Sequence, residues 1–160
     1  MSPREQLARA QAELLRALSE DGPVPEGFDA ARVRAAADGL LAKRRGSVRR
    51  AWRGLSEALG ERFTPEFNAW ARAHPLRDVE PHAGVDGYHF ASALREAGRL
   101  PERAEEEWVR FELAWRLTPE GGVVARRGVG LRWVRLGQGG GLLALRLPGG
   151  KQWRWRLSGG

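Results

Sequence analysis

The sequence has 160 residues, a length that fits one domain, or one domain with a small appendage, around a hydrophobic core. It contains no cysteine, which excludes disulfides, thiolate chemistry and zinc sites of the Cys₄ or Cys₂His₂ kind. The N-terminal stretch carries scattered charges rather than an apolar signal-peptide core, and no later apolar run approaches the roughly 18 residues of a membrane span. We therefore expect a cytoplasmic protein with no membrane partner.

The net charge of +7 lies entirely in the C-terminal part of the sequence. Residues 1–118 contain 19 basic and 19 acidic side chains, whereas residues 119–160 contain eight basic side chains and a single acidic one, Glu120. A clustered positive field attracts nucleic acid, acidic peptides or acidic protein surfaces. The distribution of charge is thus evidence about partners rather than about the fold.

Two helices are predicted in the first part of the chain. Ser2, Pro3 and Glu5 combine an N-cap serine, a proline at the first helical position and a glutamate three residues after the cap. A turn-rich linker over 20–27 follows, and Asp29 is the expected N-cap of the second helix.

A break or a kink is predicted at Gly46 and Ser47 in the second helical segment. The third helix, over 48–59, has apolar residues at helical spacing and is closed by Gly60.

Three further helices complete the predicted body. The fourth has Thr64 as its N-cap, a proline at the next position, and an end near His74. The fifth follows a polar connection over 76–86, and the sixth follows a Leu-Pro pair. Three successive glutamates at 105–107 are expected to be solvated near the positive end of the sixth helix. The apolar stripe of that helix consists of Ala104, Trp108, Phe111 and Trp115.

The pattern changes at 118–122, after which apolar and polar residues alternate with a period near two between glycine-rich turns. The expected strands cover 123–127, 129–136, 142–148 and 151–157. In the last strand, one face carries Trp153, Trp155 and Leu157, and the other carries Gln152, Arg154 and Arg156. Because a small sheet is marginal unless it buries one face, we expect the tryptophans to pack on the helices while the arginines face water.

The sequence offers no support for enzyme chemistry, and we expect no catalytic residue, no cofactor and no metal. None of the six serines lies in a G-x-S-x-G elbow or beside a plausible histidine partner. The glycine-rich turns lack the following helix and the lysine of a phosphate loop. His82 and His89 with their neighbouring carboxylates match no metal-ligand spacing, so local hydrogen bonding is the favoured interpretation.

The best signal for nucleic acid is a basic stretch over 43–53 without an acidic interruption. Its side chains are Lys43, Arg44, Arg45, Arg49, Arg50 and Arg53. Arg45, Arg49 and Arg53 recur every four residues, as phosphate-contacting side chains on one helical face do. The body around them is net neutral, and solvated arginines that offset neighbouring acids need no ligand. Nucleic acid is therefore the less favoured partner.

The tail interleaves tryptophan and arginine, a mixture that suits a protein interface and equally suits stacking on single-stranded bases. An edge strand over 151–157 or 123–127 can also pair with an extended peptide, with arginines selecting acidic side chains. The candidate partner-binding or peptide-binding residues are Arg132, Arg135, Lys151, Trp153, Arg154 and Arg156.

In chain order, the body contains AKRRGSVRRAWRGLSEALGERF, TPEFNAWARAHP, DGYHFASALREAG and LPERAEEEWVRFELAWR. The landmarks are an arginine-rich helix that runs into an LG-x-x-F turn, an aromatic helix that ends in A-x-x-HP, and an LP-x-x-A-x-x-E helix start. Over roughly residues 5–118, this order resembles the HvfC-type bacterial proteins, whose helical N-terminal region is classed as a predicted DNA-binding domain. Related helical domains occur in actinobacterial-type proteins.

This resemblance implies a partner role. HvfC-type proteins are encoded beside multinuclear non-haem iron oxidases that modify cysteines in ribosomally made peptides, and the resemblance implies presentation of the precursor. The C-terminal region of that family is larger and mixed α/β, whereas this sequence ends in a short run of predicted strands. No functional residue is carried over from the family.

Taken together, these patterns predict an α+β protein. A helical body of about six helices over 1–118 is followed, over 119–160, by an antiparallel sheet of three to four strands packed on it. The expected function is that of a non-enzymatic accessory or adaptor protein that binds a multinuclear iron oxidase or its ribosomal precursor peptide. A DNA-binding domain that uses the basic helix is the alternative, and a structural domain that pairs with itself is a third possibility.

Overall fold

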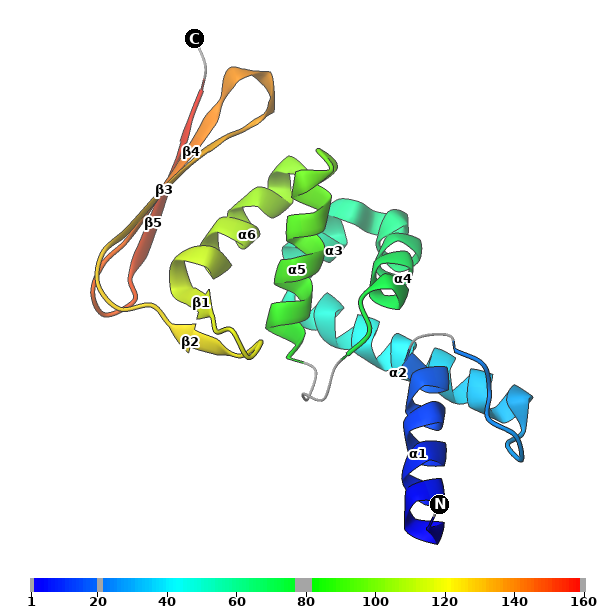
Figure 1. Ribbon diagram of the computed structural model, residues 1–160. Helices are drawn as coiled ribbons and strands as arrows, with labels where there is room; N and C mark the ends of the chain where they lie inside the picture. Colours follow the sequence, from blue (N-terminus) through cyan, green and yellow to red (C-terminus); the bar gives the residue numbers. More distant parts are fainter. Residues whose placement is uncertain (1, 20–21, 77–81, 159–160) are drawn as a thin grey trace. The chain divides into compact units, whose positions relative to one another are not determined.

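The computed structural model describes residues 2–19, 22–76 and 82–158, and its fold belongs to the predicted α+β class (Figure 1). The described residues form six α-helices and two antiparallel sheets, with the strands at the C-terminal end of the chain. No helix in these ranges has the length and apolarity needed to cross a membrane.

The chain groups into two compact units, and each is described by itself. Unit 1 comprises residues 1–47 and 61–81, and unit 2 comprises residues 48–60 and 82–160. Unit 2 thus holds both sheets together with several helices. The division into body and tail at residue 118 stays a prediction.

Unit 1 contains α1 (Pro3–Ser19), most of α2 (Ala30–Ala51), and α4 (Phe63–Ala73), which is preceded by the 3₁₀ helix η1 (Gly60–Arg62). The predicted capping box at the start of α1 is confirmed: the Glu5 amide donates to Ser2 Oγ at 3.3 Å, and the Ser2 amide donates to Glu5 Oε2 at 2.8 Å. Asp29 Oδ1 accepts from the amides of Ala31 (2.9 Å) and Arg32 (3.2 Å), as expected of an N-cap.

Several predicted helix boundaries are wrong, including the start of the fifth helix, which begins at Ala83 although the polar connection was expected to run to residue 86. Helix α2 continues through Gly46 and Ser47, and the break falls at Trp52, whose φ and ψ are −121° and 64°. A glycine inside a helix costs only about 1 kcal/mol, which the rest of a long helix readily offsets. Helix α4 begins at Phe63, one residue before Thr64, because η1 leads directly into it.

The helices of unit 2 are α3 (Arg53–Leu59), α5 (Ala83–Glu96) and α6 (Glu102–Ala114). An aromatic cluster joins them: the Phe111 ring lies 5.5 Å from Trp52 and 5.0 Å from Tyr88, and Tyr88 stacks on Trp108 at 5.9 Å between centroids. Aromatic pairs at such distances add about 0.5–1.5 kcal/mol each beyond the burial of their surface. Burial is also the main reason why the pKa of the Tyr88 phenol is raised.

The tightest contact in this cluster is between Trp52 and the backbone of α5. The indole is 2% exposed, and its Nε1 donates to the carbonyl of Gly84 at 3.0 Å. One turn later, a Cβ at Gly87 would overlap the Trp52 ring. Gly87 therefore sets how closely α5 approaches the break between α2 and α3.

The strands form a small sheet and a larger one. The small sheet pairs β1 (Trp115–Leu117) with β2 (Val123–Ala125); the larger has the order β3 (Gly130–Arg135), β4 (Gly141–Arg146) and β5 (Gln152–Leu157). Gly149 and Gly150, both with positive φ, form the predicted turn between β4 and β5. The other turn of the large sheet contains the 3₁₀ helix η2 (Gly137–Gly139).

The sequence assigned Trp115 to the last helix, and this is wrong. Helix α6 ends at Ala114, and Trp115 begins β1, where its Cα partner is Ala125. The first predicted strand of the tail consequently pairs with β1 rather than with its neighbours in the tail. Tryptophan is common in strands, and the pairing of Trp115 with Ala125 of β2 overrides the helical spacing seen in the sequence.

Two helical glycines should respond in opposite ways to substitution by alanine. Gly87→Ala should lower the free energy of unfolding by about 3 kcal/mol, because the added methyl group overlaps the buried Trp52 ring. Gly39→Ala in α2 meets open space and should raise it by up to about 1 kcal/mol through helix propensity. Urea unfolding of both variants measures the difference; equal effects would contradict the close packing at Gly87.

Candidate functional site

The register of the large sheet sorts its side chains into two faces. Leu143 of β4 lies between Trp133 of β3 and Trp155 of β5 in one row, and Leu142 lies between Val134 and Arg156 in the next. The inner face consists of Arg132, Val134, Leu142, Ala144, Arg146, Gln152, Arg154 and Arg156. The outer face consists of Leu131, Trp133, Arg135, Leu143, Leu145, Trp153, Trp155 and Leu157.

The inner face packs against α6, which corrects the expected orientation of the sheet. Val134, Leu142 and Ala144 are at most 4% exposed, and a Cβ at Gly130 would lie 3.0 Å from Leu113 of α6. The sequence correctly predicted which residues of the last strand share a face, but the arginine face is the packed one. Trp133 (52% exposed), Trp153 (41%) and Trp155 (45%) lie on the face turned away.

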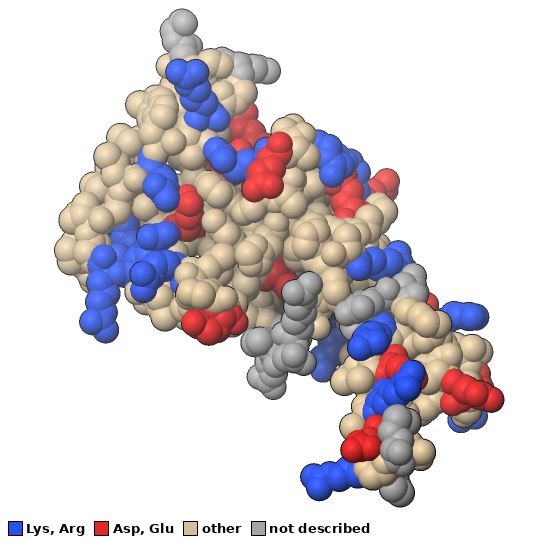
Figure 2. Space-filling model, viewed as in Figure 1, with Lys and Arg blue, Asp and Glu red and all other residues tan. Residues whose placement is uncertain are grey.

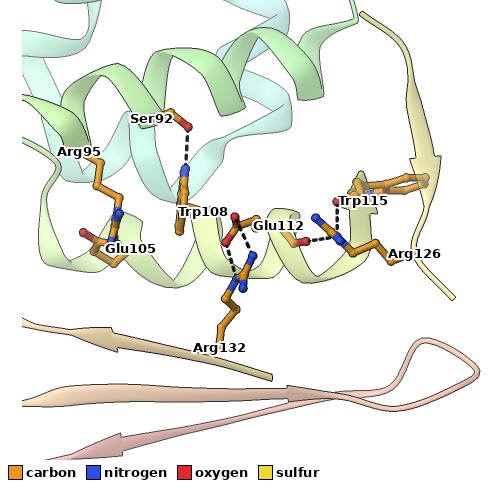
Figure 3. Close-up of polar contacts among 8 residues, drawn as sticks. All are labelled: Ser92, Arg95, Glu105, Trp108, Glu112, Trp115, Arg126 and Arg132. Atoms are coloured by element: carbon orange, nitrogen blue, oxygen red, sulfur yellow. Dashed lines mark hydrogen bonds and ion pairs between the residues drawn. The ribbon is translucent and has the colours of Figure 1, made fainter. Parts of the chain in front are cut away.

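Acidic side chains on α6 explain this orientation. Arg132 forms two hydrogen bonds with the Glu112 carboxylate, at 2.8 and 3.1 Å (Figure 3). Arg156 Nε lies 2.6 Å from Glu106 Oε1. These hydrogen bonds raise the pKa of both guanidinium groups above their ordinary values. Turning the sheet over would bury these carboxylates against tryptophan without partners, which is costly.

The three successive glutamates of α6 bind three different elements, so the expectation that they are merely solvated is wrong. Glu105 pairs with Arg95 of α5 at 3.1 Å (Figure 3), and Glu106 pairs with the sheet. Glu107 Oε2 accepts the Leu55 amide of α3 at 2.7 Å. The carboxylate thereby caps the N-terminus of α3, where the side chain of the N-cap residue Trp52 makes no capping hydrogen bond.

The outer face is a continuous apolar surface with one cation, Arg135, at its end. Trp133 lies across Gly141 of the next strand so closely that a Cβ there would overlap its ring. Leu131 (62% exposed) and Leu157 (48%) extend the surface at its two ends. Beyond Arg135, the strands contribute no charged side chain to this face.

The six predicted partner-binding residues do not form one surface. Arg132, Arg154 and Arg156 belong to the inner face, and two of them are held by acids of α6. Arg135 and Trp153 belong to the outer face. Lys151 is exposed and precedes β5. The predicted set omitted the other apolar residues of the outer face. The alternation in the last strand had nevertheless placed Trp153, Trp155 and Leu157 on one face.

The basic stretch over 43–53 is divided among several interactions. Arg44 donates to the His74 carbonyl at 2.8 Å and lies 5.3 Å from the Trp70 ring centroid, and Arg45 donates to Asn68 at 2.8 Å. Arg53 pairs with Glu57 at 2.7 Å, and this hydrogen bond raises its pKa. Arg53 belongs to α3 rather than α2, so the four-residue spacing does not follow one continuous helix. Lys43, Arg49 and Arg50 have exposed side chains.

Potential metal ligands do not cluster in the described residues, which exclude 77–81: these contain no group of three or more histidine or carboxylate side chains suited to hold an ion. His82 instead caps α5, where its Nδ1 accepts the Val85 amide at 3.3 Å. His74 Nδ1 bonds the Trp70 carbonyl at the end of α4. Both histidines thus have local structural roles.

A protein-family model described as SCO6045-like, C-terminal domain, matches residues 8–96, which is more than half of the chain. Among curated proteins, a UPF0276 protein of Streptomyces avermitilis is 43% identical over 102 residues, which cover 64% of this chain and 20% of that protein. The chain thus matches only about a fifth of the length of this relative. No solved structure matches the chain.

The orientation of the sheet can be checked by iodide quenching of tryptophan fluorescence. Replacing Trp133, Trp153 and Trp155 together by phenylalanine should remove most of the quenchable emission, because these side chains are half exposed beside cations that attract iodide. Trp108→Phe, at a side chain only 9% exposed, is the control and should leave that fraction unchanged. A triple variant that keeps the quenchable fraction of the wild type would contradict the outward orientation.

Proposed function

The chain belongs to the SCO6045-like C-terminal domain family, and from this premise we propose that it is a non-enzymatic accessory protein that docks on a larger protein partner. The observation that carries the proposal is the outer face of β3–β5, where tryptophan and leucine side chains lie in solvent while arginines are held against α6. Exposed apolar patches of this extent in a water-soluble fold mark interaction surfaces.

The size of the outer face supports a docking role. From the exposed fractions of its tryptophans and leucines, on the order of 500 Å² of apolar side-chain surface faces solvent. At about 25 cal/mol per Å², covering it offers roughly 12 kcal/mol before the costs of association. With an equal area on the partner, the interface reaches about 1,000 Å², the lower bound for a specific complex.

Its composition favours a protein over nucleic acid. Tryptophan is enriched among the side chains that dominate binding energy in protein interfaces. A surface that stacks bases also needs cations to meet the phosphates, and the arginines of β3 and β5 other than Arg135 belong to the opposite face. The leucines between the tryptophans suit apolar side chains of a partner.

The charge around the outer face favours a different protein over a second copy of this chain. Arg135 lies at one end of the face, and the exposed Lys151 directly precedes β5 at the opposite end of the sheet. Two copies facing each other would bring cations together, whereas a partner with acidic groups around an apolar patch would be attracted. The proposed partner therefore presents an apolar surface with an acidic border.

The comparisons and the sequence resemblance suggest the class of the partner. The relative from Streptomyces avermitilis carries its similar segment within a chain about five times the length of the match, so domains of this kind occur joined to a larger protein. The resemblance to HvfC-type proteins implies, for a chain on its own, a multinuclear non-haem iron oxidase that modifies ribosomally made peptides. We take such an oxidase, encoded in the same genome, as the proposed partner.

The double variant Trp133→Ser, Trp155→Ser should weaken binding to that oxidase at least about a hundredfold, because two central interface tryptophans are worth about 2 kcal/mol or more each. Isothermal titration calorimetry with the purified oxidase measures the affinity. Leu40→Ser, which removes an equally exposed apolar side chain from α2, is the control and should bind as the wild type does. An unchanged affinity of the double variant, or no binding by the wild type, would overturn the proposal.

The DNA-binding alternative makes a separate prediction. If the basic stretch binds duplex DNA, replacing Arg45, Arg49 and Arg53 by glutamine should abolish an affinity that falls steeply with salt. For an accessory protein we expect duplex binding at physiological salt no tighter than the roughly 1–100 μM of nonspecific association. Fluorescence anisotropy with a labelled duplex distinguishes the two; tight binding that is lost in the triple variant would favour DNA.

A further inference from the structure

A groove lined by arginine lies in unit 2, where one end of the inner face of the large sheet meets the end of α6. It has a volume of about 690 Å³ and is bounded by the end of α6, by β1 and β2, and by the start of β3. In Figure 2, blue side chains gather over the region where Figure 1 places β2 and the adjoining end of the sheet. The charged residues that line the groove are Arg116, Arg126, Arg127, Arg132, Arg146 and Glu112.

The groove has an excess of positive charge that its own residues do not neutralise. Of the residues that line it, Glu112 is the single carboxylate, and both its oxygens are already bonded to Arg132. Five guanidinium groups around one carboxylate repel one another, most of all where water is partly excluded. A bound anion would relieve this repulsion.

Two of the arginines are held in place by backbone carbonyls rather than by acids. Arg126 Nε donates to the carbonyls of Glu112 (2.8 Å) and Trp115 (2.9 Å), which close the end of α6 (Figure 3). Arg146 is 8% exposed, and its Nη1 donates to the Gly128 carbonyl at 2.9 Å. Such bonds fix these two guanidinium groups without neutralising them, so they add a permanent positive potential to the groove in which Arg116 and Arg127 are exposed.

The borders of the groove point to an extended peptide rather than a nucleic acid. β2 and β3 are both edge strands, so each has one side without a strand partner, and residues of both line the groove. Edge strands accept extended peptides through backbone hydrogen bonds. The exposed side chains of Val124, Val129 and Leu131 supply apolar contacts, and no aromatic side chain is present among the lining residues to stack on a base.

We propose that this groove binds an acidic, extended peptide segment whose carboxylates pair with the exposed guanidinium groups of Arg116 and Arg127. The site is chemically opposite to the apolar outer face, and Leu131 lies at the boundary between the two. A peptide in the groove would thus be held beside a protein docked on the outer face. The groove needs no second protein for binding, so it is tested on the full chain alone.

The probe is a short fluorescein-labelled peptide of alternating glutamate and valine, and binding is followed by anisotropy at physiological salt. Arg116→Gln with Arg127→Gln should weaken binding about tenfold or more, because each removes a charge-assisted hydrogen bond. The matched control, Arg135→Gln with Arg154→Gln, removes the same charge from the tail outside the groove and should bind within about twofold of the wild type. Thermal unfolding of both variants checks that they fold.

Each other outcome overturns the proposal in a recognisable way. Equal weakening in both double variants would show attraction by net charge alone, and a lysine-valine peptide that binds equally would show attraction to the apolar rim alone. Tighter binding of single-stranded oligothymidine would make the ligand a nucleic acid. If inorganic phosphate displaced the labelled peptide at an equal concentration of negative charge, the ligand of the groove would be a simple anion rather than a peptide. The double variant Trp133→Ser, Trp155→Ser should still bind the peptide, which separates a failure here from a failure of the docking proposal.

Discussion

Three successive carboxylates on α6 orient the elements that pack around this helix in unit 2. Glu105, Glu106 and Glu107 bind Arg95 of α5, Arg156 of β5 and the Leu55 amide of α3, respectively. Because successive residues of a helix point about 100° apart, three neighbours in sequence can reach three different elements. Exposed ion pairs of this kind contribute only about 0–1 kcal/mol each. Their main effect is on orientation, since they define which side of each element faces α6.

The orientation of the large sheet follows from two carboxylates of α6, Glu106 and Glu112, and from strand geometry. Side chains alternate between the faces of a strand, so directing Arg132 and Arg156 toward α6 necessarily directs Trp133 and Trp155 away from it. The buried apolar side chains of the inner face are few, and the larger apolar surface stays in solvent. This uncovered apolar face is the basis of the docking role proposed above.

The two proposed sites divide the tail by chemistry. The outer face offers tryptophan and leucine, which favour a folded protein surface, whereas the groove beside β2 offers guanidinium groups along strand edges, which favour an acidic peptide. Leu131, which belongs to the outer face and also lines the groove, makes the two sites adjacent at the start of β3. An accessory protein that brings a peptide to a larger protein needs two such adjacent surfaces of unlike character.

The sequence by itself determined the α+β class, the capped start of α1, the N-cap Asp29, the segregation of charge, and the sets of side chains that share a face of the last strand. These depend on local spacing, which the chain carries in its own order. Only the tertiary structure decided which face is covered, because a period of two places side chains together without saying what packs on them. Local patterns also do not encode contacts between residues that are distant in sequence. The break at Trp52, the roles of Glu105–Glu107 and the arginine groove depend on such contacts.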